Sequence, residues 1–524
     1  MMVPPSPFLH PQVQVALADE AATLALGHAL AAACCGGDLI RLEGDLGAGK
    51  STLARGIIQA LGHTGDVPSP TYTVMQVYDT TRFPLAHVDC YRLQDPAELA
   101  ALGLEDFRRF GVVLAEWPDR GGASLAMGGD LLPYHINSIE NPGVLTVTLT
   151  TNGPGRRATL HGSPSWQRRW ALMASRGVTF DRPVARVGGD GHLREDFVRR
   201  AGYERFSLTP MGGDWSGRSY ARVTFANGTT RMLMDAPPPQ ESVDAYAQVA
   251  DYYRSLGLRT AAIEARDDAQ GFLLTEDLGD TTLWHLLQDG TPHTDWYMAA
   301  GDVLMAQCRA HAAGNTPTWA RRYTPTDFWV EAMRVVNWLA PYATGHATAL
   351  EDYATWQRLW APHYATLMAL PQGLMMWDCQ SPNLMMTGPA PTLHNLALID
   401  HQDARIASVA QDAALLLRNI RTPRDDMREA AVLDALAHGL AVDRAALQQA
   451  VEVAGLHHAC RILGGLVRLH VRDGRSAPAQ AYLARTWDVA RQSFANPALR
   501  DIVAILETLE APSLARLTKD TAHA

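Results

Sequence analysis

A glycine-rich segment near the N-terminus carries the strongest chemical signal in this sequence. Residues 44–51 read GDLGAGKS, the spacing of a loop whose backbone N–H groups cradle phosphate. In such a loop Lys50 would carry positive charge to the outer phosphates, and the Ser51 hydroxyl would hold Mg²⁺. Only two of the 45 basic side chains are lysines, Lys50 and Lys519. Arginine does not fit that slot equally well, so the retained lysine favours a nucleotide site over a chance glycine-rich turn.

Two carboxylates follow this loop in chain order and could organise Mg²⁺ and water. Asp89 ends the apolar run 85–88, and Glu116 ends the apolar run 112–115. Each alone could be a carboxylate that merely ends a strand. Two of them behind a phosphate loop favour a metal site beside the nucleotide.

A second constellation lies far along the chain. Asp378 and Asn383 stand five residues apart, and Asp400 follows the apolar segment 396–399. In a kinase the first Asp accepts the proton of a substrate hydroxyl, while the Asn and the second Asp hold Mg²⁺ on the ATP phosphates. Asp378 could instead cap a turn and Asn383 could start a helix. That alternative does not explain all three residues together.

Length, charge and cysteine content limit the possible classes of protein. The 524 residues predict two to four domains, and 47% hydrophobic residues can fill sizeable cores. The net charge is -10, with excess acid in both halves, which disfavours direct binding to a nucleic acid backbone. The six cysteines form no C-x-x-C pair, and the sequence shows neither a secretory signal nor a run of about 20 apolar residues. We therefore expect a cytoplasmic protein without a membrane span.

The elements that must position these residues differ between the two halves. The first 160 residues alternate strand and helix signals, which is typical of a parallel α/β sheet. Strands are expected at 38–43, 74–78, 85–89, 112–116 and 144–150, and helices at 18–34, 51–61 and 96–101. The pattern breaks around Asn152-Gly153-Pro154-Gly155, where we place the domain boundary. A small strand-rich lobe is expected over 203–280, and long helices from 295 onward.

Several unlinked motifs in the first half resemble one family. After the glycine-rich loop come SPTYT at 69–73, HVDCYRL at 87–93, LEDF at 104–107 and LAEWP at 114–118. In this order they resemble the bacterial TsaE family, small P-loop ATPases required for the threonylcarbamoyl-adenosine modification of tRNA. The resemblance covers nearly all of residues 12–150. It implies action through TsaD- and TsaB-like proteins, with tRNA contacted only indirectly.

The same resemblance assigns roles to individual residues. Asp89 and Glu116 would be catalytic, and Ser51 and Glu116 would arrange Mg²⁺. The expected ATP-binding residues are Gly44, Asp45, Gly47, Ala48, Gly49, Lys50, Ser51, Thr52 and Thr71.

The second half resembles the aminoglycoside-phosphotransferase-like kinases. Residues 211–220 would form a glycine-rich cover over ATP, and 272–279 a hinge between two lobes. GDWS at 213–216, LMDAPP at 233–238, EDLG at 276–279 and DHQDA at 400–404 are most similar to the bacterial anomeric kinase of N-acetylmuramate and N-acetylglucosamine. The resemblance implies Asp378 as the catalytic base and Asn383 and Asp400 as Mg²⁺ ligands. Gly213, Ser216, Arg218 and Glu276 are the expected ATP contacts.

Two departures from that family pattern matter. Met376 stands where the family usually has a histidine, two residues before the catalytic Asp. The usual strand lysine for the ATP phosphates is also missing, because this half has no lysine before Lys519. Arg218, Arg222 or Arg231 are candidates to replace it, since guanidinium also pairs with phosphate.

Together the sequence predicts an α/β P-loop NTPase domain (1–160), a linker (161–190) and an α+β two-lobed kinase-like domain (191–510) whose small lobe ends near 280. ATP and Mg²⁺ are the expected cofactors of both. The leading hypothesis joins a tRNA-modification ATPase to an amino-sugar kinase of cell-wall recycling. The alternatives make the second half a non-catalytic nucleotide-binding or docking module, or a kinase of aminoglycosides or other small alcohols.

Overall fold

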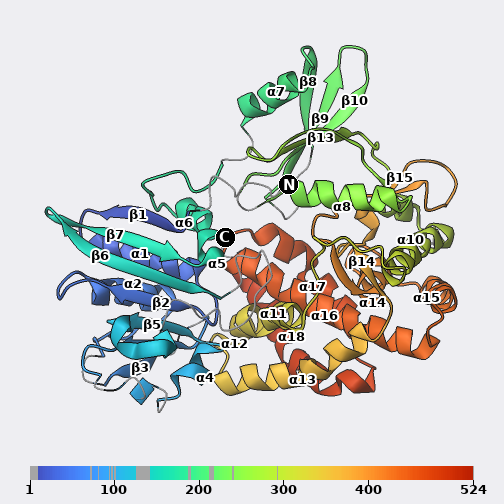
Figure 1. Cartoon of the computed structure of the whole chain (residues 1–524). Helices are drawn as coiled ribbons and strands as arrows, with labels where there is room; N and C mark the ends of the chain where they lie inside the picture. The colour runs from blue at the N-terminus through green and yellow to red at the C-terminus, as the bar shows by residue number, and fades with distance from the viewer. Residues whose placement is uncertain are drawn as a thin grey trace.

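The computed structural model describes residues 10–70, 73–78, 80, 82–93, 95, 98–99, 102–125, 142–186, 190–211, 217–238, 241–291 and 293–522. Its first part is built on a seven-stranded sheet in the order β1-β7-β6-β2-β5-β4-β3, on the left of Figure 1. The strands β4, β5, β2 and β6 run parallel to one another, and the outer strands pair antiparallel. The strands are β1 (Gln12–Leu17), β2 (Leu39–Glu43), β3 (Met75–Tyr78), β4 (Leu85–Asp89), β5 (Val112–Glu116), β6 (Val144–Asn152) and β7 (Gly155–Gly162).

Two helices pack closely together against this sheet. They are α1 (Glu20–Ala33) and α2 (Lys50–Ala60). The helices meet at glycines: a Cβ added to Gly27 would lie 3.0 Å from the backbone of Gly56. A short helix, α4 (Leu104–Arg108), precedes β5.

The five strands predicted in this part are confirmed within a residue or two, whereas β1 and β7 were not predicted. The helix expected at 96–101 falls mostly outside the described residues. Asn152 to Gly155, interpreted from the sequence as a break, is the tight turn that joins β6 to β7. The same turn-forming residues suit either a domain break or a hairpin turn. Only the pairing of β7 with β6 and β1 decides for the hairpin.

Residues beyond this hairpin continue to pack on the first sheet. Two short helices follow β7, α5 (Pro164–Gln167) and α6 (Trp170–Ser175), and Trp166 and Trp170 are fully buried in the first core. Between them Arg169 donates to the buried carboxylate of Asp38 at 2.6 Å. Part of the segment 161–190 is thus held firmly against the first sheet, while the domain boundaries themselves stay predictions.

The second part begins with a small lobe at the top of Figure 1, formed by a five-stranded antiparallel sheet in the order β12-β13-β10-β9-β8. A helix precedes this sheet and a second follows its third strand. The elements are α7 (Gly191–Arg200), β8 (Phe206–Met211), β9 (Ser219–Phe225), β10 (Thr230–Asp235), α8 (Val243–Ser255), β12 (Ile263–Asp267) and β13 (Phe272–Glu276).

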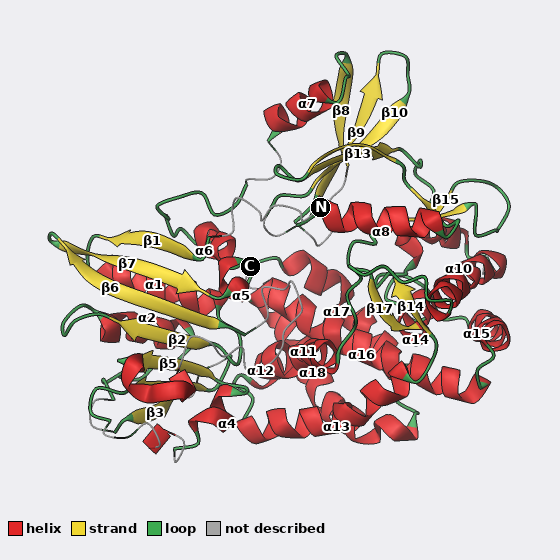
Figure 2. Ribbon diagram, in the orientation of Figure 1, coloured by secondary structure: helices red, strands yellow, loops and turns green. Residues whose placement is uncertain are grey.

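A larger helical lobe follows, as Figure 2 shows. Its small strands are β11 (Arg259–Thr260), β14 (Gln372–Met375), β15 (Leu384–Met386), β16 (Leu396–Leu398) and β17 (Arg405–Ser408). Its helices are α9 (Leu283–Leu286), α10 (Thr294–Ala312), α11 (Pro325–Arg334), the π-helix η3 (Val335–Leu339), α12 (Ala340–Thr344), α13 (Leu350–Met368), α14 (Val409–Leu417), α15 (Asp426–Leu440), α16 (Arg444–Val471), α17 (Ser476–Arg491) and α18 (Arg500–Ala522).

The helical lobe contacts the first sheet at the amino ends of its parallel strands. Arg82, just before β4, donates to two carbonyls at the end of α1 and lies over the ring of Trp338 in η3, 4.5 Å from its centre. Phe110, just before β5, stacks on Tyr353 of α13 with 5.4 Å between ring centres. The glycine-rich loop follows the carboxyl end of β2, so these contacts lie at the opposite end of the sheet.

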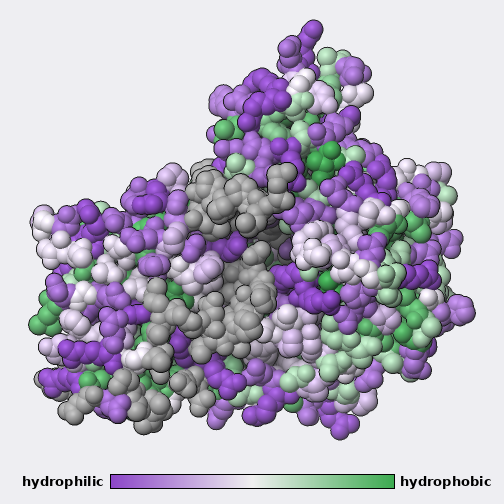
Figure 3. All heavy atoms as spheres, in the orientation of Figure 1, coloured by the Kyte–Doolittle hydropathy of each residue, from purple (hydrophilic) through white to green (hydrophobic). Residues whose placement is uncertain are grey.

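The face in Figure 3 shows hydrophobic residues scattered among polar ones over the described surface. Within the described residues, no helix combines the length and apolar character needed to cross a bilayer.

Candidate nucleotide and phosphotransfer sites

The glycine-rich loop lies between β2 and α2 and needs its glycines for backbone reasons. Gly44, Gly47 and Gly49 have φ of 133°, 79° and 102°, the region that favours glycine. A Cβ on Gly44 would also lie 2.4 Å from the carbonyl oxygen of Leu149 on β6. Gly49 leads directly into α2, whose first N–H groups are open to an anion.

Lys50 begins α2 and folds back over the loop. Its ammonium donates to the carbonyl oxygens of Gly44 at 2.7 Å and Asp45 at 2.9 Å, and it lies 4.1 Å from the centre of the Trp117 ring. Burial lowers the pKa of Lys50, and the nearby carboxylates of Glu116, Asp89 and Asp45 oppose that shift. The lysine therefore spans the loop at the point where the sequence places phosphate.

The two predicted carboxylates lie side by side at the carboxyl ends of their strands, because Asp89 is paired with Glu116 in the register of β4 and β5. Ser51 Oγ donates to Glu116 Oε1 at 3.1 Å. His87 Nε2 lies 3.0 Å from the same oxygen and was not predicted from the sequence. One hydroxyl and nearby carboxylates form the hard oxygen set that Mg²⁺ takes beside phosphates, so the residues fit the expected metal. Ala48 and Thr52 flank this site on the loop and α2, and Thr71 lies outside the described residues.

The second site is centred on Asp378, in the loop after β14. Asn383 Nδ2 donates to Asp378 Oδ2 at 2.9 Å and to its carbonyl oxygen at 3.0 Å, while Gln380 Nε2 donates to Oδ1 at 2.6 Å. Burial, with the nearby charge of Asp400, raises the pKa of Asp378 to about 7. A carboxyl with such a pKa is matched to proton transfer near neutral pH.

A residue that the sequence did not single out fixes this loop. Asp412, fully buried on α14, accepts from the backbone N–H of Met376 at 2.6 Å and of Trp377 at 3.0 Å. Trp377 has a positive φ of 70°, so its backbone is in an unfavourable conformation that these bonds help to hold. Met376 is itself buried, so the loop is held by the core and by Asp412 although the histidine usual in the family is missing. The isolated Asp in an apolar helix is the sequence signal that could have revealed it.

Of the three arginines considered as replacements for the strand lysine, Arg218 lies in the site. Its Nη1 is 2.8 Å from Asp400 Oδ1, and its Nε is 3.3 Å from the carboxylate of Glu241, just before α8. The other two are engaged elsewhere in the small lobe: Arg222 pairs with Asp277 and Asp280, and Arg231 pairs with Glu264. Glu241 was not predicted.

A cavity of about 590 Å³ joins these groups between the two lobes. Arg218, Glu276, Asp378, Asn383 and Asp400 all line it, whereas Gly213 and Ser216 lie outside the described residues. Among the described side chains no group of three His, Cys, Asp or Glu residues could hold a metal by itself. Mg²⁺ carried by a nucleotide needs only one or two protein ligands besides phosphate, so Asn383 and Asp400 fit that role.

Comparison with known proteins divides the chain in the same way. The family model "Threonylcarbamoyl adenosine biosynthesis protein TsaE" matches residues 17–141, and "Phosphotransferase enzyme family" matches residues 207–449.

Curated relatives match each part. A TsaE protein of Nostoc is 42% identical over 112 residues, which are 20% of this chain and 68% of that protein. The TsaE protein of Haemophilus influenzae is 46% identical over 84 residues, 16% of this chain and only 53% of its own length. An N-acetylmuramate/N-acetylglucosamine kinase of Caulobacter vibrioides is 29% identical over 348 residues, 59% of this chain and 93% of that protein.

Proposed function

Because the chain belongs to the TsaE family through its N-terminal domain and carries an APH-type phosphotransferase domain, we propose that it is a bifunctional enzyme with two ATP sites. The first would be an ATPase that serves threonylcarbamoyl-adenosine modification of tRNA. The second would phosphorylate the anomeric hydroxyl of N-acetylmuramate or N-acetylglucosamine, as in cell-wall recycling. The observation that carries the kinase assignment is Asp378, Asn383, Asp400 and Arg218 lining one cavity.

In the proposed kinase reaction, Asp378 accepts the proton of the anomeric hydroxyl while the hydroxyl oxygen of the sugar bonds to the γ-phosphorus of ATP. The bond between the γ-phosphorus and the oxygen that bridges to the β-phosphate breaks, and ADP leaves. Asn383 fixes the orientation of the Asp378 carboxylate through its 2.9 Å hydrogen bond. Arg218, held by Glu241, brings fixed positive charge to the phosphate side of the cavity. Bound Mg²⁺ would neutralise charge on the phosphates beside Asn383 and Asp400.

The direct test incubates the full chain with labelled ATP and a panel of N-acetylmuramate, N-acetylglucosamine, an aminoglycoside and simple alcohols. We expect the 1-phosphate of an N-acetylated amino sugar to form. If a Lys50→Ala chain, in which the first ATP site is disabled, still binds Mg-ATP but phosphorylates nothing in the panel, the result favours the docking-module alternative. Phosphorylation of the aminoglycoside instead would redirect the assignment within the phosphotransferase family.

For the N-terminal site, the support is Lys50, Ser51 and Glu116 meeting at the loop. The proposal predicts ATP turnover that depends on TsaD- and TsaB-like partners. The test measures phosphate release by the full chain with and without those proteins. Turnover that is the same with and without the partners would contradict the partner-dependent role.

Contact with tRNA is proposed to be indirect. The first 160 residues carry an excess of acidic side chains, and binding of a phosphate backbone requires clustered positive charge. Binding of bare tRNA to the full chain should therefore be weak at physiological salt. Tight binding that weakens steeply as salt rises would overturn this part of the proposal.

A further inference from the structure

Two buried aromatic side chains line the kinase cavity with nitrogen atoms that make no hydrogen bond. They are Trp377, in the loop after β14, and His458, on α16. Trp377 is 3% exposed and His458 is 2% exposed. Among the described residues, neither the indole Nε1 of Trp377 nor either ring nitrogen of His458 has a hydrogen-bond partner. Such buried groups cost free energy unless something pairs with them, so a ligand that supplies partners here would bind more tightly.

The indole of Trp377 is held in place by its neighbours. The guanidinium of Arg405 lies over the ring, 4.1 Å from its centre, and the ring of Tyr323 lies 4.4 Å away between centres. The backbone N–H of Trp377 donates to Asp412 at 3.0 Å. These contacts involve the ring and the backbone but not Nε1. Because Trp377 directly precedes Asp378, a fixed N–H donor is positioned one residue from the proposed proton acceptor.

His458 is a neighbour of this indole, with ring centres 5.9 Å apart and ring planes at 75°. Burial lowers the pKa of His458 well below its usual value, and the charge of Arg461 acts in the same direction, so the ring is neutral. The backbone of Gln411 on α14 lies near and favours protonation, but the contact lacks the geometry of a hydrogen bond. The ring proton is best placed on the nitrogen nearest Gln411, because a carbonyl attracts an N–H. The other nitrogen is then an acceptor.

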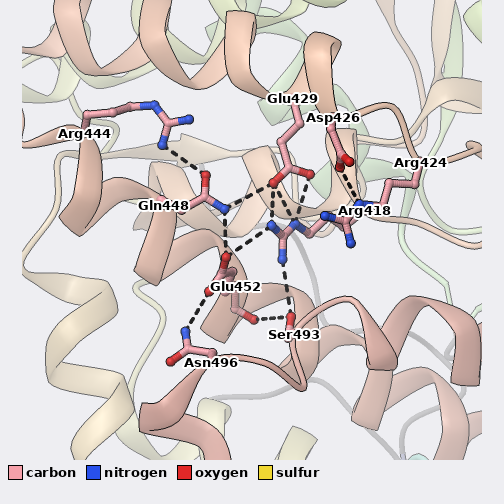
Figure 4. A network of polar contacts seen from close by, with 9 residues as sticks. All are labelled: Arg418, Arg424, Asp426, Glu429, Arg444, Gln448, Glu452, Ser493 and Asn496. Carbon is pink, nitrogen blue, oxygen red and sulfur yellow. Dashed lines mark hydrogen bonds and ion pairs between the residues drawn. The ribbon is translucent and has the colours of Figure 1, made fainter.

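The charged side chains on this side of the cavity already have partners in the chain. Figure 4 shows the guanidinium of Arg418 held by Glu429 and Glu452, with Ser493 beside it. The other guanidinium groups that line this side also interact within the chain, and they belong to Arg334, Arg421, Arg461 and Arg468. The buried groups still open to a ligand are therefore the uncharged nitrogens of Trp377 and His458.

A neutral donor beside a neutral acceptor matches a secondary amide, which offers one carbonyl oxygen and one N–H. An ammonium group can only donate, so it would leave the indole N–H without a partner. In both sugars proposed above, an acetamido group stands on the carbon next to the anomeric carbon. When the anomeric hydroxyl meets Asp378, a substituent of the neighbouring carbon comes within reach of the residue before Asp378 in the loop.

We propose that Trp377 and His458 form a subsite for the acetamido group of the acceptor. Trp377 Nε1 donates to the amide carbonyl, and His458 accepts from the amide N–H. The inference rests on the proposed kinase function and deepens it, because it names the side chains that select an N-acetylated sugar. It also disfavours aminoglycosides, which carry free amines.

The test measures steady-state kcat and KM of the full chain for N-acetylglucosamine and for glucose, in which a hydroxyl replaces the acetamido group. The unmodified chain should have the higher kcat/KM for N-acetylglucosamine. Trp377→Phe and His458→Phe keep an aromatic ring but remove the hydrogen-bonding nitrogens. Each should lower the ratio of the two kcat/KM values by about 10-fold, mainly through KM for N-acetylglucosamine, with KM for ATP unchanged.

Two matched controls lie outside the cavity. Trp360→Phe removes another buried indole N–H without a partner, on α13. His457→Phe removes the buried histidine next to His458, whose Nε2 lies 2.9 Å from the carbonyl oxygen of Phe328. Both controls should leave the ratio unchanged, whatever they do to the melting temperature.

Four results would overturn the inference. Equal kcat/KM of the unmodified chain for glucose and N-acetylglucosamine would do so without any variant, while the kinase function would stand. An unchanged ratio in both variants would do the same. Equal losses for the two sugars would show that the rings only hold the catalytic loop. If the unmodified chain phosphorylates no sugar, the proposed function fails and this inference with it. Thermal melting identifies a misfolded variant, and the comparison of sugars on the unmodified chain then decides.

Discussion

The most informative perturbation of the kinase half is Asp412→Ala. The Asp412 carboxylate accepts two backbone N–H groups, from Met376 and Trp377, directly before Asp378. Alanine would leave both buried N–H groups without this acceptor and would free a loop that contains a positive φ at Trp377. Both the stability of the lobe and the position of the proton acceptor should therefore suffer.

The magnitude follows from the two lost hydrogen bonds. A buried donor left without a partner costs about 1–3 kcal/mol, so two predict a loss of about 2–6 kcal/mol in the free energy of unfolding. Burial also raises the pKa of Asp412 to about 7, which means that its ionised form is itself costly in this site. Removing that cost offsets part of the loss, so we expect a value toward the lower end of the range. Misplacement of a catalytic group by about 1 Å can cost about 100-fold in rate, and kcat should fall at least that much.

Chemical denaturation measures the change in the free energy of unfolding. Steady-state kcat, together with KM for the sugar and for Mg-ATP, measures the change in kinase activity. Asp443→Ala is the matched control, because Asp443 also accepts a backbone N–H, from Ala446 at 2.7 Å, but as the N-cap of α16 away from the cavity. It should cost about 1 kcal/mol without changing kcat. If Asp412→Ala unfolds at the same denaturant concentration as the unmodified chain and retains its kcat, this carboxylate does not hold the catalytic loop.

Four further predictions concern the two sites. Lys50→Ala should abolish partner-dependent ATP turnover in the N-terminal half and leave the fold intact; turnover at the unmodified rate would refute the phosphate role of Lys50. Asp378→Asn should lower the kinase kcat by about 10²–10⁴-fold or more while the KM for Mg-ATP in sugar phosphorylation stays the same; a large rise in that KM would refute the assignment of Asp378 to the acceptor. Kinase kcat/KM should fall as pH drops through 7, because the pKa of Asp378 is raised to about 7 and the protonated carboxyl cannot act as a base; a flat profile across that range would contradict it. Since a raised carboxyl pKa means that stability falls as pH rises through this range, Asp378→Asn should also melt at a higher temperature than the unmodified chain at about pH 8.

The sequence predicted the parallel core of the first sheet well because these strands are buried on both faces and read as short apolar runs. Strands β4 and β5 are buried along their whole length. The outer strands β1 and β7 were missed because their exposed residues interrupt the apolar pattern. Nothing local indicates that β7 also pairs with β1, since that pairing joins residues about 145 positions apart in the chain.

In the kinase half, the residues that motif spacing singled out lie together in the structure. The side chains that hold them in position could not be predicted from the sequence. Asp378, Asn383 and Asp400 stood out because the chemistry requires those residue types at that spacing. Asp412 and Glu241 act through contacts between distant segments, with a backbone loop and with Arg218 respectively. The choice of Arg218 over Arg222 and Arg231 also depended on which carboxylates the folded chain brings near each guanidinium.

The place where the two halves meet bears on how one chain could hold the two proposed ATP sites. Arg82 and Phe110 contact the helical lobe from the amino ends of β4 and β5, whereas Lys50 and Glu116 lie at the carboxyl ends of the same sheet. The phosphate loop and the contact with the kinase lobe therefore lie at opposite ends of the sheet, which would leave the loop accessible to the proposed partners. The π-helix η3 that receives Arg82 follows directly after Arg334, which lines the kinase cavity. The two halves therefore meet at an element that continues directly from the wall of the kinase cavity.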